Sequence, residues 1–206
     1  MRRLIAARFP DHGIIGEEFG RERADAEFVW VLDPIDGTKS FISGVPLFGT
    51  LIALARRGRP IIGVIDQPIQ RERWIGADGR PTTFNGAPVR CRACAELAPA
   101  TVFATSPDMF IDKDADGFRR LARAAKLVRY GADCYAYGLL ALGFIDLVVE
   151  ASLKPYDFSA LAPIVAGAGG IATDWHGREL SLASDGRIVA AGDRRVHAAA
   201  LALLAG

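Results

Sequence analysis

The chain has 206 residues, of which 50% are hydrophobic, and its formal net charge at pH 7 is +1. This length and apolar content suffice for a buried core in one large domain or two small ones. Lys and Arg are scattered along the chain, so the sequence has no basic patch that would favour nucleic acid. No apolar run approaches the roughly 20 residues of a membrane span, and the start lacks the apolar core of a signal peptide. The composition therefore predicts a cytoplasmic protein that binds neither nucleic acid nor membrane.

The first half of the chain has the pattern of short strands joined by turns. Residues 1–9 have the pattern of an amphipathic helix, which Pro10 ends. The dipeptides Asp78-Gly79 and Asn85-Gly86 separate short apolar runs, which indicates antiparallel pairing. The predicted strands are 14–18, 28–32, 49–56, 61–66, 74–75 and 82–84, with a polar loop at 20–27. We therefore predict an α+β domain with a meandering sheet over residues 1–98.

Strand and helix patterns alternate in the second half of the chain. The predicted strands are 101–105, 127–130, 145–150, a short one from 171, and 188–191. The predicted helices are 112–126, 134–142, 158–168 and 194–204. Such alternation is typical of an α/β layer, so we predict an α/β domain with a largely parallel sheet over residues 99–206.

The three cysteines, Cys91, Cys94 and Cys134, are too few for a disulfide framework. Cys91 and Cys94 form a C-x-x-C motif, which as a redox or zinc site needs a strand-to-helix setting or a second pair of ligands. The sequence offers neither, because its histidines are isolated from this motif and from each other. A lone motif of this kind is weak evidence for a function.

The most informative stretch is Asp33-Pro34-Ile35-Asp36-Gly37-Thr38, which follows an apolar run with the pattern of a buried strand. Pro34 favours an extended Asp33, so we expect Asp33 to end the strand and Asp36 to lie in the following turn. Both carboxylates and the Ile35 carbonyl can then face one small volume. Oxygen ligands of this kind predict a site for Mg²⁺.

The residues around these carboxylates extend the candidate site. Gly37 permits a tight turn, and Thr38 suits the N-cap of a following helix, where a phosphate is favoured. Glu17 ends a short strand, and Asp157 directly precedes a helix. Ligand sites of open α/β layers lie at such places. Taken alone, Glu17 can also be interpreted as part of a solvated charge pair, and Asp157 can be interpreted as a helix N-cap.

Three segments together resemble the signatures of the inositol monophosphatase superfamily of Mg²⁺-dependent, lithium-sensitive phosphomonoesterases. They are Gly16-Glu17-Glu18, the run from Asp33 to Thr38, and Asp157 followed by Ala168-Gly169-Gly170. The resemblance extends from residue 14 to beyond residue 170. It implies a layered αβαβα sandwich of the sugar-phosphatase type and metal-assisted hydrolysis of a small phosphate ester by in-line displacement.

The resemblance also implies a role for each site residue. Two or three Mg²⁺ ions, or Mn²⁺ in their place, would be bound by carboxylates and one backbone carbonyl. The implied metal ligands are Glu17, Asp33, the carbonyl of Ile35, Asp36 and Asp157, with Asp33 bridging two ions. The backbone N–H groups of Gly37 and Thr38 would bind the phosphate. Glu17 and Thr38 would be the catalytic residues that orient the attacking water.

Within the superfamily, the second half of the chain resembles the histidinol-phosphatase branch. The resemblance lies in residues 131–137, 146–150 and 154–157, where Tyr156 stands in place of the tryptophan usual in inositol monophosphatases. It implies hydrolysis of L-histidinol phosphate, whose cationic amine suits a carboxylate near the phosphate site. Asp133 and Glu150 are the candidate substrate-binding residues, and Asp133 suits a helix N-cap equally well.

Members of the superfamily normally begin with two long helices, the second of which supplies a Thr and an Asp ahead of the Gly-Glu-Glu strand. We expect this sequence to lack that helix pair and Thr38 to lack the Asp that would orient it. Apolar surface left open in this way favours a homodimer or a weakly stable chain. The alternatives in function are an inositol monophosphatase or broad-specificity phosphatase and, in another class, a catalytically impaired remnant that binds metal.

Overall fold

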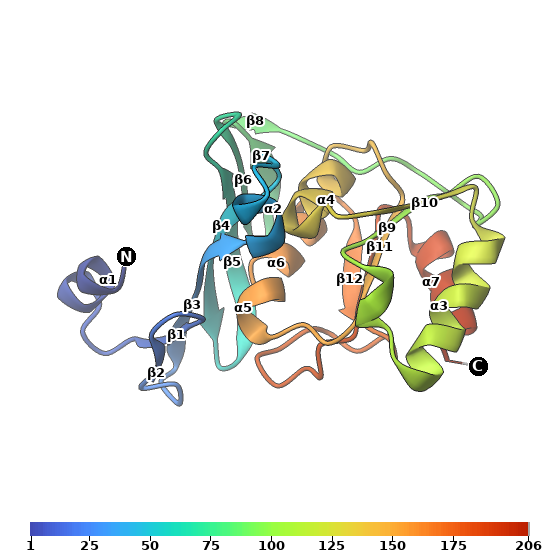
Figure 1. The fold of residues 1–206 in the computed structure, drawn as a ribbon. Helices are drawn as coiled ribbons and strands as arrows, with labels where there is room; N and C mark the ends of the chain where they lie inside the picture. The colour runs from blue at the N-terminus through green and yellow to red at the C-terminus, as the bar shows by residue number, and fades with distance from the viewer. Residues whose placement is uncertain (206) are drawn as a thin grey trace.

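The computed structural model describes residues 1–205 and contains two β-sheets (Figure 1). The first sheet has the strand order β2-β1-β3-β4-β5-β6-β7-β8, and its neighbours pair antiparallel except for β1 with β3. Its strands are β1 (Gly13–Gly16), β2 (Gly20–Glu22), β3 (Phe28–Asp36), β4 (Gly49–Arg56), β5 (Arg59–Gln67), β6 (Glu72–Ala77), β7 (Arg80–Phe84) and β8 (Ala87–Pro88). The meandering sheet is thus confirmed, although the predicted polar loop at 20–27 begins with a strand.

The second sheet has the strand order β10-β9-β11-β13-β12. Its strands are β9 (Thr101–Ala104), β10 (Leu127–Tyr130), β11 (Leu147–Glu150), β12 (Ile171–Asp174) and β13 (Ile188–Ala191). Strands β10 and β11 run parallel to β9, but β13 is antiparallel to both β11 and β12. Four of the five strands that the structure describes in this sheet therefore run in the same direction, as the prediction of a largely parallel sheet requires, and β13 runs against them. A loop rather than a crossover helix joins β12 to β13, and antiparallel neighbours need no crossover.

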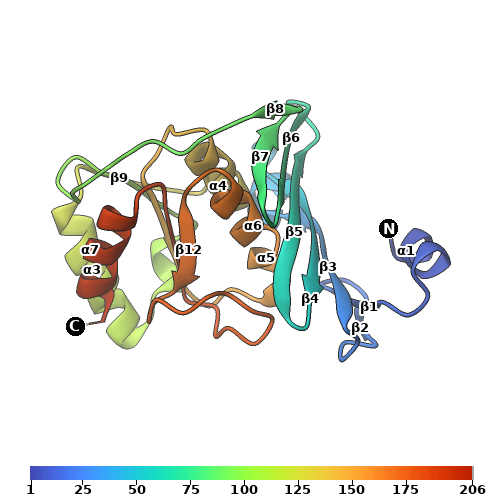
Figure 2. The same ribbon diagram turned by 180° about the vertical axis from the view of Figure 1, so that it is seen from behind.

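The helices form two layers (Figures 1 and 2). They are α1 (Arg2–Arg8), α2 (Thr38–Ile42), α3 (Asp112–Ala124), α4 (Asp133–Ala141), α5 (Pro155–Phe158), α6 (Leu161–Gly167) and α7 (Arg194–Leu204), with a short 3₁₀ helix at Pro107–Met109. Helices α4, α5 and α6 lie between the sheets, while α3 and α7 cover the far face of the second sheet. Helix α1 stands apart from both sheets and contributes no buried residue.

The predicted helix at 158–168 is divided into α5 and α6. Pro163 has no N–H to donate to the carbonyl of Ser159, so the helical hydrogen bonding is interrupted between the two. The short α5 can therefore take its own place against β3. None of the helices in residues 1–205 has the length and apolar character needed to span a bilayer.

The main hydrophobic cluster lies between the sheets and contains side chains from both halves of the chain. Leu51 and Trp74 of the first sheet pack in one cluster with Tyr137 of α4, Phe158 of α5 and Ile164 of α6. Burial of such large apolar side chains supplies most of the favourable free energy of folding. The predicted domain boundary at residue 98 stays a prediction, and this core crosses it.

A β-bulge near the end of β3 sets the direction of the site residues. Asp33 lies opposite Leu51 of β4, whereas Asp36 lies opposite Gly49. Three residue steps on β3 thus match two on β4, which leaves one extra residue in β3. Because side chains alternate between the faces of a strand, this extra residue returns Asp36 to the face that carries Asp33. The prediction that Asp33 ends the strand and Asp36 lies in a turn is therefore wrong.

Candidate metal centre

Three aspartates converge where the end of β3 meets the helix layer. Asp33 and Asp36 come from β3, and Asp157 comes from α5, which packs against β3. One carboxylate oxygen from each of the three lies within 4.8 Å of the other two. Such a spacing lets three oxygens bind a common cation. The structure thus brings together residues that are far apart in the sequence.

Backbone N–H groups fix the orientation of all three carboxylates. The bonds run from Ile35 N to Asp33 Oδ1 (2.9 Å), from Cys134 N to Asp36 Oδ2 (2.7 Å) and from Lys154 N to Asp157 Oδ2 (2.6 Å). An ionised carboxylate offers about four lone-pair sites, so acceptor capacity remains for a cation. Asp157 lies inside α5 and is not its N-cap, because Lys154 precedes the helix and Asp157 bonds back to it.

The pKa values of these aspartates are raised. Burial is the largest cause, and it raises the pKa of Asp33 to about 9, of Asp36 to about 7 and of Asp157 to about 6. The neighbouring carboxylates of Asp36 and Glu17 contribute to the pKa of Asp33. None of the ion pairs formed within residues 1–205 involves the three aspartates. Crowded carboxylates that form no ion pair bind either protons or a metal ion, so this donor set fits a hard divalent cation.

Two further predicted ligands lie beside this cluster. Glu17 follows β1, and its backbone N–H donates to the carbonyl of Leu32 at 3.1 Å. This bond places Glu17 next to Asp33, with its side chain exposed to solvent. The carbonyl oxygen of Ile35 accepts a hydrogen bond from the Thr38 hydroxyl at 3.2 Å. The assignment of Glu17 and Ile35 as metal ligands stays a prediction.

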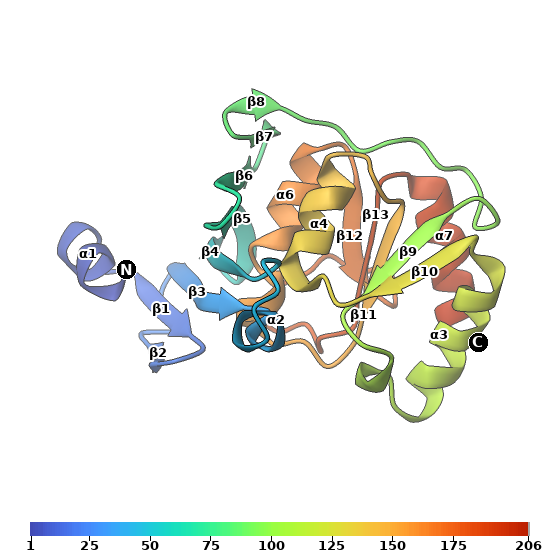
Figure 3. The same ribbon diagram turned by 45° about the horizontal axis from the view of Figure 1, so that its top comes forward.

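Gly37 and Thr38 form the start of α2, beside the start of α4 (Figure 3). Gly37 is the N-cap residue and has a φ of +81°, which glycine adopts without strain. The prediction that Thr38 is the N-cap is therefore wrong, because Thr38 is the first helical residue. A Cβ atom at Gly37 would lie 3.1 Å from Oδ2 of Asp133. Asp133 thus stands directly beside the predicted phosphate site.

Asp133 itself is the first residue of α4, after the N-cap residue Ala132, so it is not the helix N-cap. Its Oδ2 accepts a hydrogen bond from the hydroxyl of Ser40 in α2 at 3.1 Å. Burial raises the pKa of Asp133. Its φ of +45° is uncommon for a residue with a side chain, and strained backbone of this kind is concentrated at functional sites.

Glu150 lies deeper in the protein and is 3% exposed. One of its oxygens accepts a hydrogen bond from the Thr105 hydroxyl, and the other accepts one from the Tyr137 hydroxyl at 2.7 Å. Burial is the main reason that the pKa of Glu150 is raised to about 7. The role of Glu150 as a substrate-binding residue stays a prediction. Sequence reasoning missed Thr105 and Tyr137, because no local pattern marks partners that meet only in the fold.

Comparison with known proteins agrees with this architecture. A profile of the Inositol monophosphatase family matches residues 1–205. The chain is 50% identical to the bifunctional phosphatase IMPL2, chloroplastic, of Arabidopsis thaliana over 207 residues, which are 96% of this chain and 60% of that protein. It is 38% identical to the histidinol-phosphatase of Chlorobaculum parvum over 191 residues, which cover 92% of this chain and 74% of that protein.

A solved inositol monophosphatase from Zymomonas mobilis superposes with a TM-score of 0.95 and 47% sequence identity, over 100% of this chain and 79% of that one. The fold is that of solved inositol monophosphatases. The chain belongs to the inositol monophosphatase family. It spans 60% of the length of the Arabidopsis relative.

Proposed function

We propose that the chain hydrolyses a small phosphate monoester with Mg²⁺ as the metal. The observation that carries this proposal is the convergence of Asp33, Asp36 and Asp157, none of which forms an ion pair within residues 1–205, in a chain of this family. An all-oxygen donor set favours Mg²⁺ or Mn²⁺ over metals that prefer nitrogen or sulfur ligands. When bound, such ions would activate a water and neutralise charge on the phosphate.

The acidic residues and the carbonyl of Ile35 would bind the cations at two neighbouring positions. Asp33 lies between the other acids of the site, so it would contribute to two neighbouring cation positions. One position would be completed by Glu17 and the carbonyl of Ile35, and the other by Asp36 and Asp157. The bulge in β3 and the three backbone N–H donors support this arrangement, because they fix the carboxylates before a cation binds.

Residues at the start of α2 would bind the phosphate and the water. The N–H groups of Gly37 and Thr38 lie in the first turn of the helix and have no helical acceptor. We propose that they donate to phosphate oxygens. The Thr38 hydroxyl is exposed and bonded only to the carbonyl of Ile35 among residues 1–205, so it can turn to a water. Together with Glu17, it would hold that water in line with the phosphorus.

We propose L-histidinol phosphate as the substrate. Relatives named histidinol-phosphatase are 38% and 34% identical to the chain. The half-buried carboxylate of Asp133 beside Gly37 supports the proposal, because it offers a negative charge to the substrate's amine. Inositol phosphate is the second candidate, since the solved relative with 47% identity is an inositol monophosphatase.

Phosphate release with saturating Mg²⁺ tests both substrates on the same protein. We expect a higher kcat/KM for L-histidinol phosphate than for inositol phosphate. Asp133→Asn should raise KM for L-histidinol phosphate about tenfold, the loss of one charged contact, and should change KM for inositol phosphate little. A preference for inositol phosphate would overturn the substrate. Mg²⁺ binding without release of phosphate from either compound would favour the catalytically impaired remnant.

We also propose that the chain forms a homodimer. Large apolar side chains are exposed on the N-terminal segment, and contiguous exposed apolar surface is typical of contacts between proteins. The residues are Leu4 (77% exposed), Phe9 (40%) and Phe19 (78%). Light scattering after size-exclusion chromatography should give twice the monomer mass, and a monomer mass at micromolar concentration would contradict this. The cytoplasmic location stays a prediction, and the Arabidopsis relative is named as chloroplastic.

A further inference from the structure

Glu150 is the last residue of β11, at the edge of the second sheet where its parallel strands end. Val148 of β11 lies opposite Phe103 of β9, and this register, continued by two residues, places Glu150 beside Thr105. The Thr105 hydroxyl donates a hydrogen bond to Oε1 of Glu150. Ligands of α/β sheets bind at the carboxyl ends of parallel strands. Glu150 therefore lies at the edge of the sheet where a ligand is expected.

Helix α4 contributes a second acid and a second hydroxyl to the same region. Asp133 is the first residue of α4 and stands beside Gly37. Tyr137 follows four residues later, so the side chains of Asp133 and Tyr137 lie on one face of the helix. The Tyr137 hydroxyl donates to Oε2 of Glu150 at 2.7 Å, and Tyr137 is completely buried. One helix thus carries one candidate substrate-binding acid and holds the other.

The two hydroxyl groups fix the Glu150 carboxylate and leave it able to accept further hydrogen bonds. Each oxygen accepts one bond from a hydroxyl, whereas an ionised carboxylate offers about four lone-pair sites. Acceptor capacity therefore remains for the N–H groups of a ligand. Thr105 follows β9 and Tyr137 belongs to α4, so the two bonds come from different elements. The carboxylate cannot turn without breaking one of them.

The surroundings of Glu150 favour a cationic partner. Glu150 takes part in none of the ion pairs found within residues 1–205. Burial is the largest cause of its raised pKa, and the carboxylates of Asp133 and Asp157 contribute to the rise. The Thr105 and Tyr137 hydroxyls act in the opposite direction, because they bond to the ionised form. A cation bound here would relieve the repulsion among the acids, so the site fits the positively charged part of a ligand.

We propose that Tyr137 and Thr105 are positioning residues for substrate recognition: their hydroxyls hold the Glu150 carboxylate in the orientation that binds the cationic part of L-histidinol phosphate. This inference rests on the proposed function, because it takes that compound as the substrate and Glu150 as one of its contacts. Neither hydroxyl needs to touch the substrate. A carboxylate that is oriented before binding loses less conformational freedom when the substrate arrives, so loss of a hydroxyl weakens binding.

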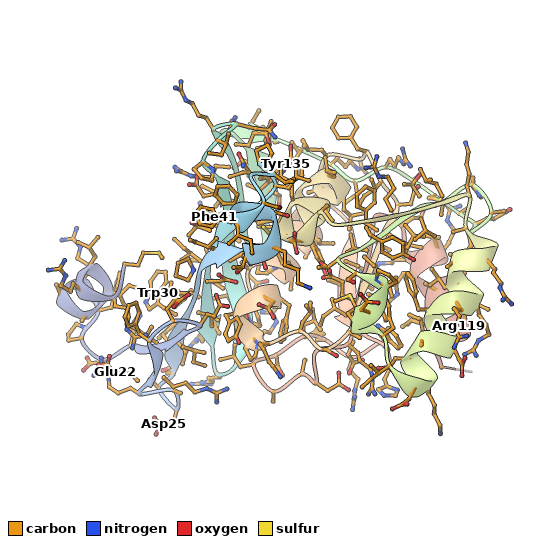
Figure 4. All side chains as sticks on the ribbon, in the orientation of Figure 1. Glu22, Asp25, Trp30, Phe41, Arg119 and Tyr135 are labelled. Carbon is orange, nitrogen blue, oxygen red and sulfur yellow. The ribbon has the colours of Figure 1, made fainter. Side chains whose placement is uncertain are left out.

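Matched variants of two tyrosines in α4 test the proposal. Tyr137→Phe removes the bond to Glu150, whereas Tyr135→Phe removes a bond of the same length, 2.7 Å, from Tyr135 to Glu72 of β6. Tyr135 lies on the side of α4 toward β6 and β7 (Figure 4) and contacts Trp74 edge to face. At saturating Mg²⁺, we expect Tyr137→Phe to raise KM for L-histidinol phosphate about tenfold and to change kcat little. Tyr135→Phe should keep the wild-type KM, and circular dichroism verifies that each variant is folded.

A double-mutant cycle separates the positioning of Glu150 from a general disturbance of the fold. Glu150→Gln removes the charge that the hydroxyls hold. In that background Tyr137→Phe should raise KM no further, because two residues that act through one contact are not additive. KM for inositol phosphate, whose ring carries no cation, should rise less than KM for L-histidinol phosphate, because a charged hydrogen bond is the stronger one.

Three results would overturn the proposal while the wild type is active on L-histidinol phosphate. They are a wild-type KM in Tyr137→Phe, an equal rise of KM for both substrates, and an equal rise of KM in the Glu150→Gln background. Thr105→Val removes the other hydroxyl and replaces Tyr137→Phe if that variant does not fold. A wild type that releases no phosphate from L-histidinol phosphate would overturn the proposed substrate and this inference together.

Discussion

Two groups of carboxylates in this molecule have opposite surroundings. Asp33, Asp36 and Asp157 gather where β3 meets α5, and burial raises the pKa of each. Asp146 directly precedes β11 and Asp174 ends β12, and they are 2% and 4% exposed. They are as deeply buried as Asp33, yet their pKa values are lowered. Burial alone therefore does not distinguish the two groups.

The difference lies in their partners. Asp146 accepts two hydrogen bonds from the Arg92 guanidinium, at 2.6 and 2.5 Å, and one from the Thr101 N–H at 2.7 Å. Asp174 accepts bonds from the backbone and the guanidinium of Arg178, at 2.9 and 2.6 Å. Burial opposes ionisation at both, and these bonds overcome it.

Asp146 and Asp174 thus each have an arginine of their own, which holds them ionised. The three aspartates at β3 and α5 have orienting backbone donors and no such cation among the ion pairs of residues 1–205. A cluster that is oriented but not neutralised is arranged for a cation from solution. This contrast separates a ligand site from a structural ion pair on physical grounds.

Asp36→Asn should give the largest effect of any change in the comparison. Asparagine keeps the shape and an acceptor for the Cys134 N–H but removes a negative charge from the cation position. We expect phosphate release at saturating substrate to fall on the order of a thousandfold or more, because the metal stabilises the transition-state charge. The metal-free variant should be at least as stable as the wild type at pH 8. Unchanged activity would show that the metal mechanism is wrong.

The two groups should also respond to pH in opposite directions. A carboxyl whose folded pKa is raised binds more protons in the folded than in the unfolded state, so stability falls as pH rises from about 4 to the folded pKa. For Asp33, Asp36 and Asp157 that window ends at about 9, 7 and 6. For Asp146 and Asp174 the folded pKa is lowered, so their contribution is present above about pH 4 and is lost as pH falls below it.

Urea unfolding in EDTA from pH 5 to pH 9 should therefore show falling stability, by up to about 1.4 kcal/mol per pH unit for each proton lost. Saturating Mg²⁺ should remove most of this fall, because the cation takes the place of the protons. A metal-free profile that rises between pH 5 and pH 9 would contradict the pKa values of the cluster.

Asp146→Ala should affect stability and leave metal binding unchanged. It removes the acceptor of the Thr101 N–H and the partner of Arg92. The Arg92 side chain is 43% exposed, so solvent screens the ion pair and the lost hydrogen bonds dominate. We expect the free energy of unfolding to fall by about 2 kcal/mol. Mg²⁺ titration of the folded variant provides the control, and an altered affinity would remove the distinction between the two groups.

The sequence predicts the regular elements well because their signals are local. The strands 127–130 and 188–191 and the helix 194–204 match β10, β13 and α7 residue for residue. Each has an apolar pattern of one period, bounded by turn or cap residues, and such a pattern depends on no distant partner. The Asp33 to Thr38 motif is local as well, so its candidate ligands could be named before the fold.

The bulge and the hydrogen-bond partners of the buried Glu150 could not be predicted in this way. The bulge depends on the register of β3 against β4, and a run of apolar residues does not fix where one extra residue is inserted. Glu150 meets Thr105 across 45 residues, and the Asp36 carboxylate meets the Cys134 N–H across 98. Only the assembled layers bring such partners together. The antiparallel direction of β13 likewise depends on strands that are distant in the sequence.

Binding of Mg²⁺ should by itself raise the free energy of unfolding of the unsubstituted protein, and this effect is smaller than those above. At ten times its dissociation constant, a cation that binds only the folded state adds about 1.4 kcal/mol of stability. For a chain of this size, this raises the unfolding temperature by about 3–6 °C. Differential scanning fluorimetry should show this shift in wild type and in Asp146→Ala, and EDTA should reverse it. Asp36→Asn should show little shift at the same Mg²⁺ concentration, because its cation position has lost a charge. An equal shift in Asp36→Asn would place the bound Mg²⁺ elsewhere on the protein.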